Sequence, residues 1–321
     1  MAVYTHLTEA DITGFLAAFD IGALEQFQGV EQGVENTNYI LHLIDAKKSK
    51  QKAVLTLFEK RVREADVPFY LSAMAHLSRQ GAPTPSPIAD RDGMSVHRLA
   101  GRPAVLTTFL IGAPHMSPSI ENCAALGRTV AELHNAAGGF AQERKNDLGP
   151  EGWSALADAC RADAERCAPG LTSLIDRALA TVSEQWPSDL PRGLIHADLF
   201  PDNVFFDGDK LCGVIDFYFA CTDFFVLDLA ICLNAWASEN GAWNQDKAKA
   251  LLLGYESVRP LASTEKNALP IMVCGAALRF LLTRLFDWIN QVDGAIVTVK
   301  DPLEYARLLD HHLNSKNSLI R

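Results

Sequence analysis

The chain is organised around residues 194–217, which read LIHADLFPDNVFFDGDKLCGVIDF. Apolar runs in this part of the sequence predict three short strands, at 193–195, 204–206 and 210–215. Three side chains that carry oxygen, Asp198, Asn203 and Asp216, therefore lie in the loops or at a strand end. Loops held by a rigid scaffold are where catalytic and binding residues are concentrated. We therefore expect the chemistry of the protein to lie here.

The spacing of these three residues indicates a magnesium-dependent reaction on phosphate. Carboxylate and amide oxygens are the ligands that Mg²⁺ prefers, and substrate phosphates fill its other positions. The pattern H-x-D-x-x-x-x-N, followed by an Asp after the next strand, has the layout of a kinase catalytic loop. That layout assigns Asp198 to the substrate hydroxyl, and Asn203 and Asp216 to the metal. The alternative is a β-hairpin whose polar residues only cap turns.

Length and composition narrow the class of protein. The 321 residues suggest about two domains. A net charge of −10 argues against nonspecific binding of nucleic acid. The seven cysteines are odd in number and lack a C-x-x-C pair, which indicates reduced thiols and not a disulfide framework or zinc site. Without a secretory pattern or a long uninterrupted apolar run, we expect a cytoplasmic protein that does not span a membrane.

The pattern of elements predicts an α+β fold in two lobes. The first part should hold an antiparallel meander and two further strands, at 23–30, 38–44, 53–58, 94–99 and 104–108, with helices at 8–19 and 66–80. The remainder should be mainly helical, with helices at 117–134, 153–167, 171–185, 225–237, 245–255, 262–287 and 302–313. We therefore divide the chain into a β-rich nucleotide-binding lobe at 1–106, a hinge at 107–113, and a helical lobe at 114–321 with the catalytic loop and the acceptor site.

Two segments of the first part are candidates for contact with a nucleotide. A turn between strands offers small polar groups and a glycine that allows close approach of backbone to phosphate. The hinge offers backbone groups that a flat heterocycle can pair with, and clefts between domains are common ligand sites. An ordinary turn and an edge strand are the alternatives. The candidate residues are Gly33, Asn36, Asn38, Thr108, Phe109 and Leu110.

Other polar residues of the second part are expected to support the loop or the acceptor. His196, two residues before Asp198, should brace the loop. Asp228 lies in an apolar run, where a carboxylate must be paired, so we expect a second brace. Asp223 is a candidate for binding a cationic group of the substrate, and an exposed turn residue is the alternative.

Nearly the whole chain resembles a known group of enzymes. Residues 194–216 and the two-lobe order resemble the protein-kinase-like phosphotransferases of small molecules, which include aminoglycoside and choline kinases. More narrowly, GVENTNY at 33–39, VLTLFE at 54–59 and ALRFLLTRL at 277–285 are similar to the bacterial homoserine kinases of this fold. The resemblance implies phosphorylation of the side-chain hydroxyl of L-homoserine by ATP with Mg²⁺, which feeds threonine synthesis.

One position departs from the usual kinase pattern. Where many kinases carry a phosphate-binding Lys in the third strand, the matching residue is Thr56. Lys60 and Arg61 are candidates for the missing charge, with Glu64 or Asp66 as partner. Because of this departure, a protein that binds ATP without turning it over stays an alternative.

The acceptor site follows from the chemistry of a zwitterion. A carboxylate is best held by an Arg fork. Arg279 and Arg284 lie in an apolar helix, on different faces because they are five residues apart. Arg284 can pair with Asp287 at i+3, which leaves Arg279 as the candidate for the carboxylate, with an internal ion pair as the alternative.

Three other functions remain compatible with the sequence. The enzyme could phosphorylate an aminoglycoside, choline or a sugar. It could bind a nucleotide as a regulator without turnover. It could also be a metal-dependent hydrolase that uses His196, Asp198 and Asp216, although this function gives the β-rich lobe no role.

Overall fold

The computed structural model describes residues 4–30, 36–59, 62–291 and 300–315. Contacts divide the chain into two compact units, and the division falls between Ile111 and Gly112.

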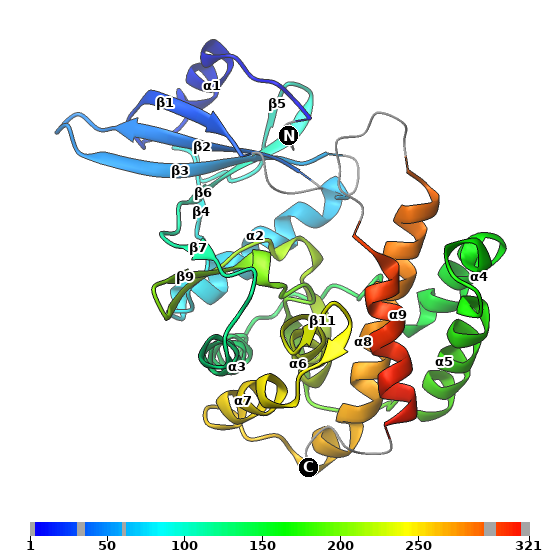
Figure 1. The fold of residues 1–321 in the computed structure, drawn as a ribbon. Coiled ribbons are helices and arrows are strands. Elements are labelled where there is room, and N and C mark those ends of the chain that lie inside the picture. The colour runs from blue at the N-terminus through cyan, green and yellow to red at the C-terminus, as the bar shows by residue number, and fades with distance from the viewer. Residues whose placement is uncertain (1–3, 31–35, 60–61, 292–299, 316–321) are drawn as a thin grey trace. The chain divides into compact units, whose positions relative to one another are not determined.

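The first unit contains an antiparallel sheet in the order β1-β2-β3-β6-β4, with β5 paired to β6 (Figure 1). The strands are β1 (Ala23–Gly29), β2 (Thr37–Ile44), β3 (Lys50–Leu57), β4 (Pro87–Ile88), β5 (His97–Leu99) and β6 (Arg102–Thr108). The meander of the first three strands is confirmed. β4 lies at the end of a proline-rich segment that we expected to be only a connector, and Pro87 pairs with Thr107 there.

The core of this unit lies between the sheet and α1 (Glu9–Leu16), which begins with a capping box of Thr8 and Asp11. Alternate residues of β2, including Leu41 and Leu43, are buried and meet Ile12 of the helix. This alternation is what a sheet with one covered face requires. Residues after β3 form a 3-10 turn, η1 (Glu64–Asp66), and then α2 (Val67–Arg79).

The second unit is mainly helical. Its helices are α3 (Ile120–Ala136), α4 (Pro150–Cys167), α5 (Leu171–Gln185), α6 (Phe225–Trp236), α7 (Gln245–Glu256), α8 (Ser263–Ile289) and α9 (Pro302–Asn314). The predicted helices are confirmed within a few residues at most ends. α3 begins later than expected, because Ser119 and Asn122 form its capping box in place of Ser117 and Pro118.

α8 is long and apolar enough to cross a membrane by length and composition alone. In the structure, however, 83% of its most apolar window is buried. The helix packs against α4, α5, α6 and α9 (Figure 1). It is therefore the core helix of this unit.

Short strands frame the catalytic stretch. They are β7 (Ala113–Pro114), β8 (Arg192–Ile195), β9 (Val204–Asp207), β10 (Lys210–Val214), β11 (Cys221–Phe224), β12 (Ser238–Glu239) and β13 (Ala242–Trp243). β9 pairs with β10 and β7, whereas β8 pairs with β11. The loop at 196–203 therefore connects strands of two different sheets, so the alternative of a simple hairpin around this loop was wrong. The sequence did not reveal β11, the strand with which β8 pairs.

Candidate active site

The catalytic stretch contains two residues in left-handed backbone conformations. Ala197 has φ +64° and Asp216 has φ +65°. Such a conformation costs an L-residue other than glycine about 1–2 kcal/mol. It persists only where the surroundings hold it, and such residues cluster at functional sites. Ala197 directly precedes Asp198, and Asp216 is itself one of the three residues that the sequence assigns to the chemistry.

Asp228 of α6 holds the first of these turns by its backbone. Its Oδ1 accepts from the N–H of Ala197 at 2.8 Å, and its Oδ2 accepts from the N–H of His196 at 3.0 Å. His134 of α3 lies 3.1 Å from the same Oδ2 through Nε2. Burial by itself raises the pKa of Asp228, but these hydrogen bonds and the neighbouring histidines bring it below the usual value. The carboxylate is therefore ionised, and both of its oxygens accept hydrogen bonds from within the protein.

The His196 ring connects the loop to the end of β10. Its Nε2 donates to the carbonyl of Ile215 at 2.8 Å, and its Nδ1 accepts from the N–H of Asp198 at 3.2 Å. Burial lowers the pKa of His196. Both contacts suit a neutral ring with its proton on Nε2. The ring thus fixes Asp198 relative to the residue that precedes Asp216.

Asn203 joins Asp198 to the same strand end. Its Nδ2 donates to the Asp198 carbonyl at 2.8 Å and to Oδ2 of Asp198 at 3.3 Å. Its own carbonyl accepts from the N–H of Ile215 at 3.0 Å. The structure therefore brings the three predicted residues to one loop cluster, because Asp216 follows Ile215 directly. Burial raises the pKa of Asp198 to about 6, although the positive charges of Arg279 and Lys300 lower it.

The oxygens of this cluster fit a magnesium ion. The side chain of Asn203 makes its hydrogen bonds to Asp198 through its NH₂ group, and its Oδ1 is an acceptor that can serve as a metal ligand. Together with the carboxylate of Asp216, this gives two hard oxygen ligands. Mg²⁺ is usually held by one or two carboxylates while phosphates and waters fill its other positions. Among the described residues, no group of three or more His, Cys, Asp and Glu side chains has the geometry of a metal site.

Sequence reasoning missed the polar chain behind Asp228. Nδ1 of His134 lies 2.7 Å from the hydroxyl of Tyr255, which accepts from Arg259 at 3.0 Å. Arg259 also pairs with Glu265 at 3.0 Å. These residues come from α3, α7, the segment after α7, and α8. The signal in the sequence was the presence of His134 on the apolar side of its helix, but its partner Asp228 is 94 residues away. Glu265 lies among polar residues at 263–267 and gave no signal.

The arginines of α8 are buried side chains with internal partners. Arg279 is 2% exposed, and its Nη1 donates to the carbonyl of Ala197 at 2.8 Å. Arg284 reaches α9, where it contacts Glu304 and donates to the carbonyl of Asp301 at 3.1 Å. We had expected Arg284 to find its partner at Asp287, within its own helix. The partner Glu304 lies on a different helix, 20 residues away.

Asp223 lies in β11 and not in an exposed turn. Its Oδ2 accepts from Nδ2 of Asn146 at 2.8 Å, and its Oδ1 accepts from the N–H of Phe224 at 2.7 Å. Its part in binding a cationic group stays a prediction.

The polar candidate residues for the nucleotide that the structure describes in the first unit make hydrogen bonds within the protein. Thr56 donates to Oδ1 of Asn38 at 2.6 Å, and the side chain of Asn36 accepts from the N–H of Glu59 at 3.3 Å. Gly33 lies outside the described residues.

Thr108, the second residue of the predicted hinge at 107–113, is the last residue of β6. The N–H of Thr108 donates to the carbonyl of Ser86 at 2.9 Å inside the sheet. Thr108 therefore cannot offer this group to a heterocycle. Phe109 and Leu110 follow the end of β6, and Lys52 lies 5.0 Å from the centre of the Phe109 ring.

The substitutes for the missing strand Lys stay a prediction. Lys60 and Arg61 lie outside the described residues. Glu64 pairs with Arg98 at 2.6 Å, and Asp66 pairs with Arg63 at 2.9 Å. Both carboxylates thus have a cationic partner among the described residues, and their part in holding Lys60 or Arg61 stays a prediction.

Comparison with known proteins gives full-length relatives. The family model of the phosphotransferase enzyme family matches residues 26–261. A homoserine kinase of Xanthobacter autotrophicus is 50% identical over 313 residues, which cover 97% of this chain and 96% of that protein. A homoserine kinase of Gluconacetobacter diazotrophicus is 48% identical over 320 residues, which cover 99% and 98%.

Solved structures share the fold at low sequence identity. An amicoumacin kinase, in complex with AMP-PNP and Ca²⁺, has a TM-score of 0.68 at 15% identity and covers 96% of this chain and 93% of its own. A choline kinase of Cryptosporidium parvum has a TM-score of 0.65 at 14% identity, with 95% and 94% covered. The predicted protein-kinase-like fold is confirmed.

Proposed function

The chain belongs to the phosphotransferase enzyme family and, within it, to the homoserine kinases, and we propose that it transfers the γ-phosphoryl group of ATP to the side-chain hydroxyl of L-homoserine. The products are O-phospho-L-homoserine and ADP. The observation that carries this proposal is the loop cluster of Asp198, Asn203 and Asp216 in a chain half identical to homoserine kinases over its whole length.

Asp198 directs the hydroxyl of the acceptor. A general base needs hydrogen-bond reach to the proton that it takes. Because Asn203 holds Oδ2 of Asp198, we assign Oδ1 to the acceptor hydroxyl. As the acceptor oxygen bonds to the γ-phosphorus, its proton passes to Asp198, and the bond to the leaving ADP oxygen breaks. Asp228 and His196 keep the carboxylate in place for this step.

Mg²⁺ fits the oxygens of Asn203 and Asp216, as the donor set indicates. When bound, the ion neutralises charge on the phosphates and orients them. Asn203 would then have two tasks, because its NH₂ group positions Asp198 while its side-chain oxygen would be a ligand of the metal. Phosphoryl transfer depends chiefly on such positioning and electrostatics.

The division of labour between the units follows from the same proposal. Residues 1–106 form the nucleotide-binding lobe, 107–113 the hinge, and 114–321 the lobe that holds the acceptor. In the first lobe, Asn36, Asn38 and Thr56 line the nucleotide together with Gly33, and backbone groups of Phe109 and Leu110 pair with the heterocycle. We also propose a cytoplasmic location, since both substrates are metabolites of that compartment, with no membrane or nucleic-acid partner.

A panel of acceptors tests the proposed function. ADP release is measured with L-homoserine, choline, an aminoglycoside, a hexose and no acceptor, each with ATP and Mg²⁺. We expect turnover with homoserine to exceed the others by at least about 100-fold in kcat/KM. Faster turnover of another acceptor would replace homoserine, release without acceptor would indicate a hydrolase, and ATP-dependent thermal stabilisation without any turnover would indicate a regulator.

A further inference from the structure

Arg279 contacts the active loop at its strained residue. Its guanidinium is buried in the middle of α8 and donates to the carbonyl of Ala197 at 2.8 Å. Its Cζ also lies 4.6 Å from the ring centre of Phe280. A buried cation is costly unless it is paired or hydrogen-bonded. Among the described residues, this costly buried charge is hydrogen-bonded to a backbone carbonyl of the active loop.

Ala197 is held on both sides by ionised side chains. Its N–H donates to Asp228 of α6, and its carbonyl accepts from Arg279 of α8. The partners lie 31 and 82 residues away in the sequence. The carbonyl of Ala197 belongs to the peptide that leads into Asp198. Rotation of this peptide moves the Cα–Cβ bond of Asp198, so whatever fixes the carbonyl also fixes the direction of the carboxylate.

We propose that Arg279 is a positioning residue that fixes the peptide between Ala197 and Asp198, and not the ligand of the acceptor carboxylate. The inference deepens the proposed kinase function and rests on it. With 2% exposure and a bond to the loop, Arg279 holds Asp198 through the backbone, in addition to lowering the pKa of Asp198 by its charge. It therefore contributes to the rate of transfer and not to the affinity for homoserine.

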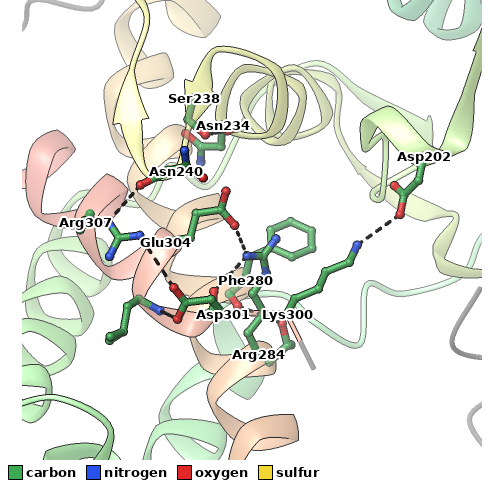
Figure 2. A network of polar contacts seen from close by, with 12 residues as sticks. Asp202, Asn234, Ser238, Asn240, Phe280, Arg284, Lys300, Asp301, Glu304 and Arg307 are labelled. Carbon is green, nitrogen blue, oxygen red and sulfur yellow. Dashed lines mark hydrogen bonds and ion pairs between the residues drawn. The ribbon is translucent and has the colours of Figure 1, made fainter. Parts of the chain in front are cut away.

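α8 also supplies a matched control. Arg284 lies five residues after Arg279, is 9% exposed, and stacks over Tyr305 at 4.4 Å. Figure 2 shows its guanidinium directed to Glu304 and Asp301 of the α9 region. Its hydrogen bonds among the described residues go to these two and none goes to the loop. Replacing either arginine removes a buried cation from the same helix, but only one replacement frees the carbonyl of Ala197.

The test compares Arg279→Met, Arg279→Lys and Arg284→Met in steady-state kinetics, with thermal unfolding recorded for each. For Arg279→Met we expect kcat to fall about 100-fold while both KM values stay within about threefold, because small misplacements of a catalytic group are costly. Arg279→Lys should recover part of the loss. Arg284→Met should lower Tm by a similar amount and keep kcat within about threefold.

A glycine at the strained position provides the second arm. Glycine adopts a positive φ without the penalty that alanine carries. In the Arg279→Met background, Ala197→Gly should therefore raise kcat by about tenfold, since the left-handed turn no longer needs the lost hydrogen bond. A crystal structure of Arg279→Met should show the peptide between Ala197 and Asp198 rotated.

Several results would overturn the inference. A rise of more than about tenfold in the KM for homoserine with kcat intact would make Arg279 a substrate ligand. Equal losses of kcat in the Arg279 and Arg284 variants, or no recovery with Ala197→Gly, would make its role one of general stability. If wild-type protein transfers phosphate to no acceptor, the proposed function fails. The crystal structure then decides the positioning role alone, and an unchanged peptide refutes it.

Discussion

Two groups of polar residues in this chain are built on opposite principles. In the first unit, Thr56 and Asn38 are direct cross-strand neighbours, and a neutral hydrogen bond of 2.6 Å joins them. In the second unit, the turn before Asp198 is held by charged side chains from α6 and α8. The sheet pair follows from register alone. The loop depends on helices that lie far away in the sequence.

The difference shows where the chain accepts an energetic cost. A neutral pair within a sheet costs little and places two side chains only as well as the sheet does. Ionised groups inside a protein are costly to bury and strongly directional. Their use at the loop indicates that the orientation of one peptide matters more there than stability does.

The largest effect in either region is expected for Asp198 itself. Asp198→Asn removes the acceptor of the hydroxyl proton and leaves the ligands of the metal in place. We expect kcat to fall at least about 1,000-fold, while ATP with Mg²⁺ still stabilises the protein in thermal unfolding. Asp202→Asn is the matched control, because Asp202 lies on the same loop and pairs with Lys300 at 3.3 Å at the surface (Figure 2). Substantial transfer by Asp198→Asn would remove the residue from the reaction.

The second prediction tests the cost of the charged support. Asp228→Ala leaves the N–H groups of His196 and Ala197 and the ring of His134 without their shared acceptor. We expect the free energy of unfolding in urea to fall by about 3–5 kcal/mol, as for other broken buried charge pairs. Asp228→Asn keeps one acceptor oxygen and should lose less. A loss below about 1 kcal/mol for the alanine variant would contradict the comparison.

A buried histidine away from the loop makes the free energy of unfolding dependent on pH. His312 of α9 donates from Nε2 to Asn234 at 2.8 Å, and its Nδ1 has no partner among the described residues. Burial, with a smaller contribution from His311, lowers the pKa of His312 to about 3. The folded protein thus keeps the ring neutral, while the unfolded chain takes up a proton near pH 6.5.

The sign of the effect follows from this difference. The stability that His312 contributes is present above pH 6.5 and is lost as the pH falls toward 3. Between pH 7 and pH 5 we expect the free energy of unfolding to fall by about 2 kcal/mol from this residue. Urea titrations of wild type and His312→Gln measure it, since the variant should lack this part of the slope. Equal slopes would show that the ring is protonated in the folded state.

The smallest effect is expected in the sheet. Thr56→Val keeps the shape of the side chain and removes the hydrogen bond to Asn38. We expect a loss of about 1 kcal/mol in the free energy of unfolding. The KM for ATP of the same variant reports whether the pair also contacts the nucleotide. A loss as large as that of Asp228→Ala would erase the distinction between the two regions.

Much of the fold follows from local signals in the sequence. The periodicity of β2 and the apolar faces of the long helices predicted their elements within a few residues. β4 and β11 escaped prediction because their partners, and not their own residues, make them strands. The start of α3 was predicted at Ser117, but Ser119 is the residue that has Asn122 at the spacing of a capping box.

The sequence indicated which residues are candidates for the chemistry, but not which contacts hold them in place. The spacing from Asp198 to Asn203 and the carboxylate after β10 are contiguous features that a single segment carries. The partners of Asp228 and Arg279 are long-range, and a buried cation in an apolar helix looks the same whether it binds a substrate, a carboxylate or a backbone carbonyl. Only the tertiary fold distinguishes these three uses.

α8 has a consequence for how the chain is made. Before folding, this segment of 27 residues has the length and apolar character of a membrane-spanning helix. An arginine near the centre of such a helix opposes insertion into a bilayer by about 2.5–3.5 kcal/mol. Arg279 and Arg284 therefore disfavour partitioning of the unfolded segment into a bilayer, whereas in the folded unit α4, α5, α6 and α9 pack against it. The two charges therefore matter for the unfolded segment as well as for the folded protein.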